Sequence, residues 1–146
     1  MLMCRYGKDH VHVTASSRTA ASAIEGVTVH SCFGLQRGNK TVEVLMKEMG
    51  RKAKDNWAAT EVVTIEEYSL IDAAFLDLLD NMGRHMKSKD VPFGGVRVIL
   101  VGDIAQLPPV NDVDDHPSGS DYVVADVQYA FEARCGRMVL TSSALV

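Results

Sequence analysis

V-R-V-I-L-V-G-D-I-A-Q-L-P-P-V, from Val96 to Val110, joins the best strand pattern of the chain to its least ordinary loop. Residues 96–101 form a β-branched and aliphatic run, which predicts a strand covered on both faces, as in a parallel sheet. Asp103 and Gln106 follow at the carboxyl end of that strand, the edge where open α/β sheets bind ligands. The stretch therefore predicts an α/β fold with a binding loop, although a strand followed by a rigid turn has the same local form.

The overall composition predicts one globular domain without a membrane span. The chain has 146 residues, of which 47% are hydrophobic and only 4 are proline, which suits a single packed core. No apolar run approaches the roughly 18 residues of a membrane helix, and no secretory leader is evident. The three widely spaced cysteines indicate reduced thiols in an intracellular protein. With a formal net charge of -4, nucleic-acid binding would need a local patch or uncharged donors.

A strand, a polar loop and a small helix are predicted near the N-terminus. The strand H-V-H-V-T would place His10 and His12 on one face, but no third ligand lies nearby to complete a metal site. A helix over residues 18–24 would be capped by Ser16 or Ser17. The same hydroxyls, with the amides at the helix start, could hold a phosphate oxygen without a net positive charge. Ordinary helix capping is the alternative explanation of these two serines, and the local pattern favours it.

The segment G-L-Q-R-G-N-K-T, which begins at Gly34, is nearly a phosphate loop. It has Asn39 where the second glycine of that motif belongs, and the preceding H-S-C-F is too short and polar for a central strand. We therefore expect a turn ahead of an amphipathic helix over residues 41–49. The same segment leaves open an ATPase that binds nucleotide through Lys40 in this variant loop.

A carboxylate pair follows the strand-like run E-V-V-T-I. Glu66 and Glu67 would lie at the carboxyl end of this strand. In nucleotide hydrolases, the first of two such carboxylates holds Mg²⁺ and the second orients the attacking water. An exposed acidic turn would give the same pattern. An amphipathic helix over residues 72–87 then leads to the strand at 96–101, so both polar loops are expected at one sheet edge.

Several motifs together resemble those of Pif-type (petite integration frequency) helicases of superfamily one. G-D-x-x-Q-L-P-P-V, from Gly102, resembles motif III, and T-A-S-S-R-T-A-A, from Thr14, resembles motif Ia. G-V-T-V-H-S-C-F-G, from Gly26, is similar to the element after motif Ia. E-E-Y-S-L-I-D, from Glu66, resembles the family's D-E-I-S-M-L-D, and Y-A-F-E-A, from Tyr129, its F-x-F-E-A element.

This resemblance implies a mostly parallel sheet flanked by helices, in an incomplete RecA-like (P-loop NTPase) domain. Residues 1–146 would lack the phosphate-loop segment and the second RecA-like domain, so the isolated chain should hardly hydrolyse ATP. The complete protein would use ATP and Mg²⁺, bind single-stranded DNA and unwind DNA in the 5′ to 3′ direction. The implied setting is replication, repair, recombination or telomere maintenance in the nucleus or mitochondrion. Residues 111–121 are expected to form a mobile acidic loop.

Roles carried over by the resemblance fall on nine side chains. Glu67 would polarise the attacking water, Gln106 would read the terminal phosphate, and Glu66 would hold the metal. Glu66 stands where the family has aspartate, and its extra methylene predicts weaker Mg²⁺ binding and reduced hydrolysis. The expected DNA contacts are Ser16, Ser17, Arg18, Thr28, His30 and Phe33. Arg18 replaces a family glycine, so it could add a phosphate contact or block a close backbone approach.

The main alternative belongs to a different functional class. The chain could be a non-catalytic single-stranded DNA-binding or interaction module that kept the sheet of a helicase and lost the ATPase. Such a module would bind DNA in a way that is insensitive to nucleotide and depends on Ser16, Thr28 and His30.

Overall fold

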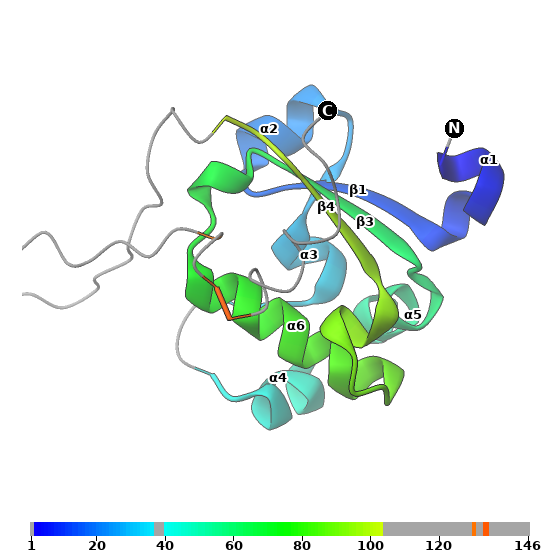
Figure 1. Ribbon diagram of the computed structural model, residues 1–146, viewed down its shortest axis with the longest axis vertical. Coiled ribbons are helices and arrows are strands. Elements are labelled where there is room, and N and C mark those ends of the chain that lie inside the picture. The colour runs from blue at the N-terminus through cyan, green and yellow to red at the C-terminus, as the bar shows by residue number, and fades with distance from the viewer. Residues whose placement is uncertain (1, 37–39, 104–129, 131–132, 135–146) are drawn as a thin grey trace, which may run out of the picture.

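A four-stranded parallel sheet lies at the centre of the computed structural model, which describes residues 2–36, 40–103, 130 and 133–134 (Figure 1). Every strand pair in it is parallel, and the strand order is β2-β1-β3-β4. The mostly parallel α/β fold predicted from the sequence is therefore confirmed. The strands are β1 (Val11–Ala15), β2 (Val27–Thr28), β3 (Val62–Glu66) and β4 (Arg97–Val101).

Helices and short 3-10 turns connect these strands. The predicted helices over 18–24, 41–49 and 72–87 correspond to α2, α4 and α6, with ends that differ by at most one residue. No helix in the described ranges is both long and apolar enough to span a bilayer. The helices are α1 (Leu2–Tyr6), α2 (Arg18–Ala23), α3 (Val29–Phe33), α4 (Val42–Glu48), α5 (Arg51–Ala59) and α6 (Ala73–Lys87); the 3-10 turns are η1 (Lys8–His10), η2 (Tyr68–Leu70) and η3 (Pro92–Gly95).

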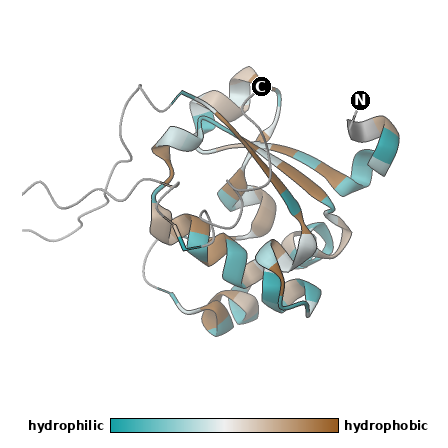
Figure 2. Cartoon of the chain, viewed as in Figure 1, coloured by the Kyte–Doolittle hydropathy of each residue, from teal (hydrophilic) through white to brown (hydrophobic). Residues whose placement is uncertain are grey.

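The hydrophobic core lies between the sheet and helices α3, α5 and α6, which cover one of its faces (Figures 1 and 2). Val63 and Ile65 of β3 contribute from the sheet side. The ring of Phe33 lies 4.4 Å from the ring of Trp57, whose indole nitrogen donates a 3.1 Å hydrogen bond to the Phe33 carbonyl oxygen. Trp57 therefore anchors α5 against α3, and helix α5 itself was not predicted from the sequence.

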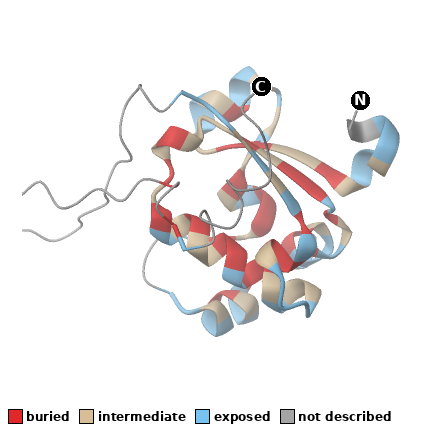
Figure 3. Cartoon of the chain, in the orientation of Figure 1, coloured by how far each residue is buried: buried red, intermediate tan, exposed pale blue. Residues whose placement is uncertain are grey.

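The prediction that residues 96–101 are covered on both faces is wrong for the described part of the chain. There β4 is an outer strand, and its residues alternate between partly buried and exposed (Figure 3). Val98 and Leu100 pack against the core, whereas Ile99 and Val101 are 37% and 39% exposed. An aliphatic run shows that a strand has buried neighbours, but it does not show on how many sides they lie.

The phosphate-loop alternative at residues 34–41 does not fit the local structure. H-S-C-F belongs to helix α3, and Gly34 ends that helix in a left-handed conformation with φ 64°. A phosphate loop needs a strand at that place. The Lys40 ammonium group also donates to Gln36 Oε1 and Glu48 Oε2, each at 2.6 Å. Residues 37–39 themselves lie outside the described residues.

The two N-terminal histidines do not form a metal pair. Strand β1 begins at Val11, so His10 belongs to η1, where its Nδ1 lies 2.7 Å from the Ala59 carbonyl oxygen. The His12 ring forms a T-shaped contact with the Phe33 ring, with centroids 6.0 Å apart. Within the described ranges, no three side chains of the metal-binding types gather in one place.

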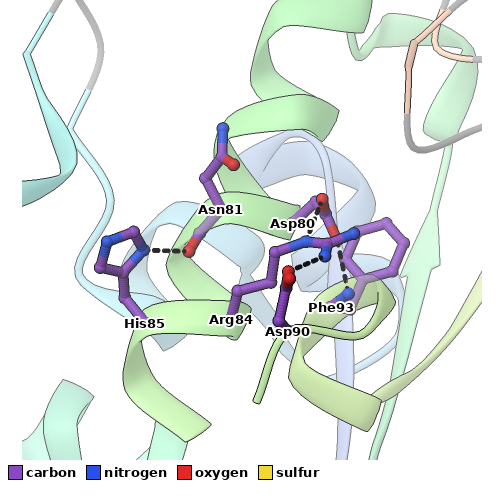
Figure 4. A network of polar contacts seen from close by, with 6 residues as sticks. All are labelled: Asp80, Asn81, Arg84, His85, Asp90 and Phe93. Atoms are coloured by element: carbon purple, nitrogen blue, oxygen red, sulfur yellow. Dashed lines mark hydrogen bonds and ion pairs between the residues drawn. The ribbon is translucent and has the colours of Figure 1, made fainter. Parts of the chain in front are cut away.

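A polar junction between α6 and η3 sets the start of β4 (Figure 4). The buried Asp80 carboxylate accepts from the Phe93 backbone N–H and, at 2.8 Å, from Arg84 Nε. Arg84 Nη1 also donates to Asp90 Oδ1 at 2.7 Å. A Cβ at Gly94 would lie 2.2 Å from the Gly83 carbonyl oxygen, so the two backbones approach as closely as glycine permits.

Candidate functional site

The carboxyl ends of all four described strands meet at one edge of the sheet. Ala15 of β1 pairs with Thr28 of β2 on one side and with Glu66 of β3 on the other. Glu66 pairs in turn with Val101 of β4. The segments that follow the strands therefore lie side by side, as a parallel sheet requires. Every predicted site residue that the structure describes ends one of these strands or belongs to a segment that follows one; His30 and Phe33 belong to α3, which directly follows β2.

The carboxylate pair forms a sharp turn at this edge. Glu66 is the last residue of β3, and Glu67 has left-handed backbone angles, φ 54° and ψ 45°, before η2 begins. The Ser16 backbone N–H donates to the Glu66 carbonyl oxygen at 3.0 Å. The Ser16 hydroxyl donates to the Glu67 carbonyl oxygen at 2.7 Å. Ser16 thus joins the loop after β1 to the turn that carries both carboxylates.

The loop after β4 packs directly on this turn. A Cβ at Gly102 would lie 3.1 Å from the Tyr68 backbone nitrogen and 3.3 Å from Glu67 Cα. Asp103 follows and is exposed. The expectation that both polar loops lie at one sheet edge is confirmed as far as Asp103. Gln106 and the acidic segment 111–121 lie outside the described residues.

The donor set of the turn suits a hard divalent cation. Glu66 and Glu67 supply carboxylate oxygens, which are the protein ligands that Mg²⁺ prefers. Mg²⁺ usually takes only one or two carboxylates and completes its shell with water and phosphate oxygens, so a cluster of three acids is not required. Among the residues present, Glu66 would hold the ion at this turn.

Ser17 and Arg18 lie at the start of α2, beside this turn. Ser17, and not Ser16, caps the helix: its side-chain oxygen accepts from the Ala20 N–H at 3.1 Å. That contact uses a lone pair, which leaves the Ser17 hydroxyl hydrogen for another acceptor. Arg18 is the first residue of the helix and is exposed. Because its backbone is helical, this position does not require the conformational freedom of glycine.

Thr28 and His30 lie at the start of α3, on the far side of β1. The Thr28 side-chain oxygen accepts from the Ser31 N–H at 3.2 Å and donates to the Ser31 hydroxyl oxygen at 3.0 Å. The His30 ring stacks on Phe75, with centroids 4.3 Å apart. Ser31 is exposed, and the sequence analysis did not single it out as a partner of Thr28. The threonine three positions before it, in the spacing of a helix cap, was the available indication.

Phe33 was wrongly predicted as a DNA contact. Its side chain is 1% exposed and contacts the rings of Trp57 and His12. Residues 28 and 31 stay at the surface, whereas the turn of α3 carries Phe33 into the core. A buried ring cannot stack on a base, so its role is to pack α3 against α5.

Comparison with known proteins adds the family to this geometry. The model of the family described as PIF1-like helicase matches residues 1–140. The chain belongs to the PIF1-like helicase family. It is 41% identical over 114 residues to the ATP-dependent DNA helicase RRM3 of Saccharomyces cerevisiae, which covers 76% of this chain and 16% of that protein. It is 35% identical over 131 residues to the ATP-dependent DNA helicase PIF1 of the same species, which covers 88% of this chain and 14% of that protein.

Solved structures of PIF1-like proteins share the fold. The crystal structure of Pif1 helicase from Candida albicans superposes with a TM-score of 0.77 at 35% identity, over 93% of this chain and 28% of that one. Bacteroides Pif1, in complex with ADP-AlF3 and ssDNA, gives a TM-score of 0.66 at 29% identity, over 91% of this chain and 30% of that one. The chain therefore has the fold of part of a RecA-like helicase, and spans about a seventh of the curated relatives' length.

Proposed function

We propose that this chain is part of an ATP-dependent DNA helicase, with ATP hydrolysis and single-stranded DNA binding at the carboxyl edge of the sheet. The observation that carries the proposal is the turn of Glu66 and Glu67, which ends β3 next to the start of the loop after β4. Support comes from the similar Bacteroides Pif1, whose structure is in complex with ADP-AlF3 and ssDNA.

In this proposal the two carboxylates have different roles. Glu67 orients and deprotonates the attacking water, and Gln106 reads the terminal phosphate by donating an amide hydrogen to it. Glu66 holds Mg²⁺, which when bound neutralises charge on the phosphates. Because phosphoryl transfer depends on positioning, the rigid turn at Glu67 suits this chemistry.

Single-stranded DNA would run over the segments after β1 and β2. Ser17 has a hydroxyl hydrogen for a backbone phosphate, and Arg18 adds an exposed charge. Thr28, through its pair with Ser31, and His30 extend the same edge. The helical backbone and exposure of Arg18 favour an added phosphate contact over a blocked approach. Ser16 was a further candidate, but its hydroxyl hydrogen already goes to Glu67.

Other features of the complete protein follow from the family resemblance. The complete protein would contain a phosphate-loop segment and a second RecA-like domain in addition to these residues. It would move along DNA in the 5′ to 3′ direction and act in the nucleus or mitochondrion. An arginine supplied from such a domain is worth about 10³ to 10⁵ in rate. The short chain by itself is accordingly expected to have little ATPase activity.

The test is DNA-stimulated ATP hydrolysis by a complete protein, in which this chain is joined to the proposed phosphate-loop segment and second RecA-like domain. We expect hydrolysis to rise on addition of single-stranded DNA, and Glu67→Gln to lower it by about 10³-fold or more while ATP binding persists. Robust ATP hydrolysis by the 146-residue chain alone would contradict the proposal that it is only part of a helicase. A complete protein that binds single-stranded DNA equally with and without ATP, and hydrolyses none, would instead support the non-catalytic module.

The non-catalytic module is favoured by one observation: this chain has Glu66 where the Pif-type motif has aspartate. The sequence named Ser16, Thr28 and His30 as the contacts of such a module, and the Ser16 hydroxyl bonds to Glu67 instead. Replacing Thr28 and His30 together by alanine should therefore abolish DNA binding by the module. Retained affinity in this double variant would exclude the module.

A further inference from the structure

The hydroxyl of Ser16 is used inside the protein, at the residue proposed to act on water. Ala15 and Glu66 pair across β1 and β3, so Ser16 follows one strand exactly where the carboxylate turn follows the other. Its backbone N–H reaches the Glu66 carbonyl oxygen at 3.0 Å. Its side chain reaches the Glu67 carbonyl oxygen at 2.7 Å. The two bonds hold the carbonyl groups on either side of the Glu67 Cα, one in each of the two peptide groups that flank it.

The left-handed backbone conformation of Glu67 needs hydrogen bonds that stabilise it. A left-handed conformation at a residue with a side chain costs about 1 kcal/mol or more, and it persists only where the surroundings impose it. The Glu67 carbonyl oxygen also accepts from the Leu70 N–H at 3.2 Å, which closes η2. Of these two bonds to the Glu67 carbonyl oxygen, the one from Ser16 is the shorter and comes from the loop after the neighbouring strand β1. It therefore fixes the turn relative to the sheet.

A serine hydroxyl has one hydrogen to donate, and phosphate oxygens act only as acceptors. Because the Ser16 hydrogen goes to Glu67, it is not shared with a DNA phosphate. Ser17, one residue later, accepts from the Ala20 N–H and donates its hydrogen to no group among the described residues. The two neighbouring serines thus have different roles despite their identical side chains.

We propose that Ser16 is a positioning residue for Glu67: its hydroxyl holds the left-handed turn that aims the Glu67 carboxylate, and it is not a DNA contact. This inference rests on the proposed ATPase function. It predicts an effect on the rate of hydrolysis that is separate from the binding of ATP and DNA.

The first experiment measures the complete protein with Ser16→Ala and Ser16→Thr. Ser16→Ala should lower kcat for DNA-stimulated ATP hydrolysis by about five- to tenfold, the scale of one lost hydrogen bond. KM for ATP and Kd for oligothymidylate should stay within about twofold. Ser16→Thr keeps a hydroxyl and should restore kcat. An unchanged kcat with a raised Kd for DNA would overturn the proposal, because Ser16 would then be a DNA contact.

The second experiment uses the 146-residue chain itself and needs no activity. Hydrogen exchange at the Leu70 amide, which bonds to Glu67, should be about five- to tenfold faster in Ser16→Ala and return to the original rate in Ser16→Thr. Thr14→Val is the matched control, because it removes the 2.7 Å bond from the Thr14 hydroxyl to the Thr64 carbonyl oxygen between the same two strands. It should leave Leu70 exchange unchanged.

The two experiments separate this inference from the proposed function. A complete wild-type protein without DNA-stimulated hydrolysis would end the proposed function, while fast Leu70 exchange in Ser16→Ala would still support the Ser16 contact. If Leu70 exchange is the same in Ser16→Ala and in the wild type, Ser16 does not hold the turn, and the inference fails.

Discussion

Glu66 places its carboxylate one methylene further from the backbone than aspartate would, a difference of about 1.5 Å. Misplacement of a catalytic group by about 1 Å can cost on the order of 100-fold in rate, and Mg²⁺ tolerates little deviation from octahedral geometry. In the complete protein, Glu66→Asp should therefore raise ATP hydrolysis by about tenfold or more and lower the Mg²⁺ concentration needed for half-maximal rate. A Mg²⁺ titration of the ATPase rate measures both effects.

Glu67→Asp is the matched control for this change, since it shortens the neighbouring carboxylate by the same amount. It should lower the rate, because Glu67 already has the side chain expected by the family pattern. If Glu66→Asp leaves both the rate and the Mg²⁺ requirement as they are, Glu66 does not hold the ion.

Cys32 is predicted to resist alkylation at neutral pH. Burial raises the pKa of its thiol to about 11, against smaller opposing effects of Lys52 and of the hydrogen bond from Asn56. The thiolate is the reactive form, so a raised pKa leaves little of it at about pH 8. Iodoacetamide labelling followed by peptide mass mapping should show slow reaction at Cys32 that accelerates as the pH approaches about 11. Cys4, which is exposed, is the internal reference. Equal rates at both cysteines at neutral pH would contradict the burial.

At the scale of elements, α6 shows why some of the fold could be predicted from the sequence. Apolar residues recur along it at helical spacing, and Asp72 caps it by accepting from the Phe75 N–H at 2.7 Å. Both features involve residues close together in the chain, so the amino-acid sequence alone reveals them. The carboxylate turn was located for the same reason, because it directly follows a strand-like run.

Other elements depend on contacts between residues far apart in the chain, which the amino-acid sequence alone does not reveal. Helix α5 is short and mostly polar, and it buries Trp57 against Phe33, 24 positions away. Phe33 was misassigned because its inward direction depends on the packing of α3 against that helix. The internal role of the Ser16 hydroxyl depends likewise on a partner 51 positions along the chain.

His12 of β1 gives the sheet a dependence on pH. Burial lowers the pKa of its imidazole below the ordinary 6.5, with a smaller opposing effect of Asp9, and its Nε2 has no hydrogen-bond partner among the described residues. Below pH 6.5 the unfolded chain therefore binds more protons than the folded one, and folding stability falls as the pH falls. Chemical denaturation at about pH 7.5 and about pH 5.5 should show this loss, and His12→Gln should show a smaller one. Equal losses in the two proteins would contradict the effect.

The junction of α6 and η3 should be intolerant of any side chain at its two glycines. A Cβ at Gly83 would lie 2.5 Å from the Phe93 carbonyl oxygen, and Gly94 has φ 64° as well as a 2.2 Å clash. Gly83→Ala and Gly94→Ala should each lower the free energy of unfolding by about 1–3 kcal/mol or more, measured by urea denaturation. Gly50→Ala is the control, because nothing lies within 4 Å of its added Cβ. It should cost less than about 1 kcal/mol.

At the scale of the whole molecule, the charge distribution limits how DNA can be held. The chain carries a formal net charge of -4, so it offers no general attraction to a polyanion. At the carboxyl edge of the sheet, the candidate contacts are mostly hydroxyl groups, and Arg18 is the charged one among them. Hydroxyl contacts to phosphate release no counterions, so binding through this part of the protein should depend only weakly on salt.

This argument gives a prediction for Arg18. Each neutralised phosphate of a single strand contributes about -0.7 to the slope of log K against log salt concentration. In the complete protein, Arg18→Ala should make that slope less steep by about 0.7 for oligothymidylate, measured by fluorescence anisotropy over a salt series. Lys89→Ala removes the same charge from the opposite edge of the sheet, where Lys89 lines a hollow with Glu61 and Arg97, and should leave the slope unchanged. An unchanged slope in Arg18→Ala would show that Arg18 does not bind phosphate, and equal changes in both variants would indicate an effect of net charge alone.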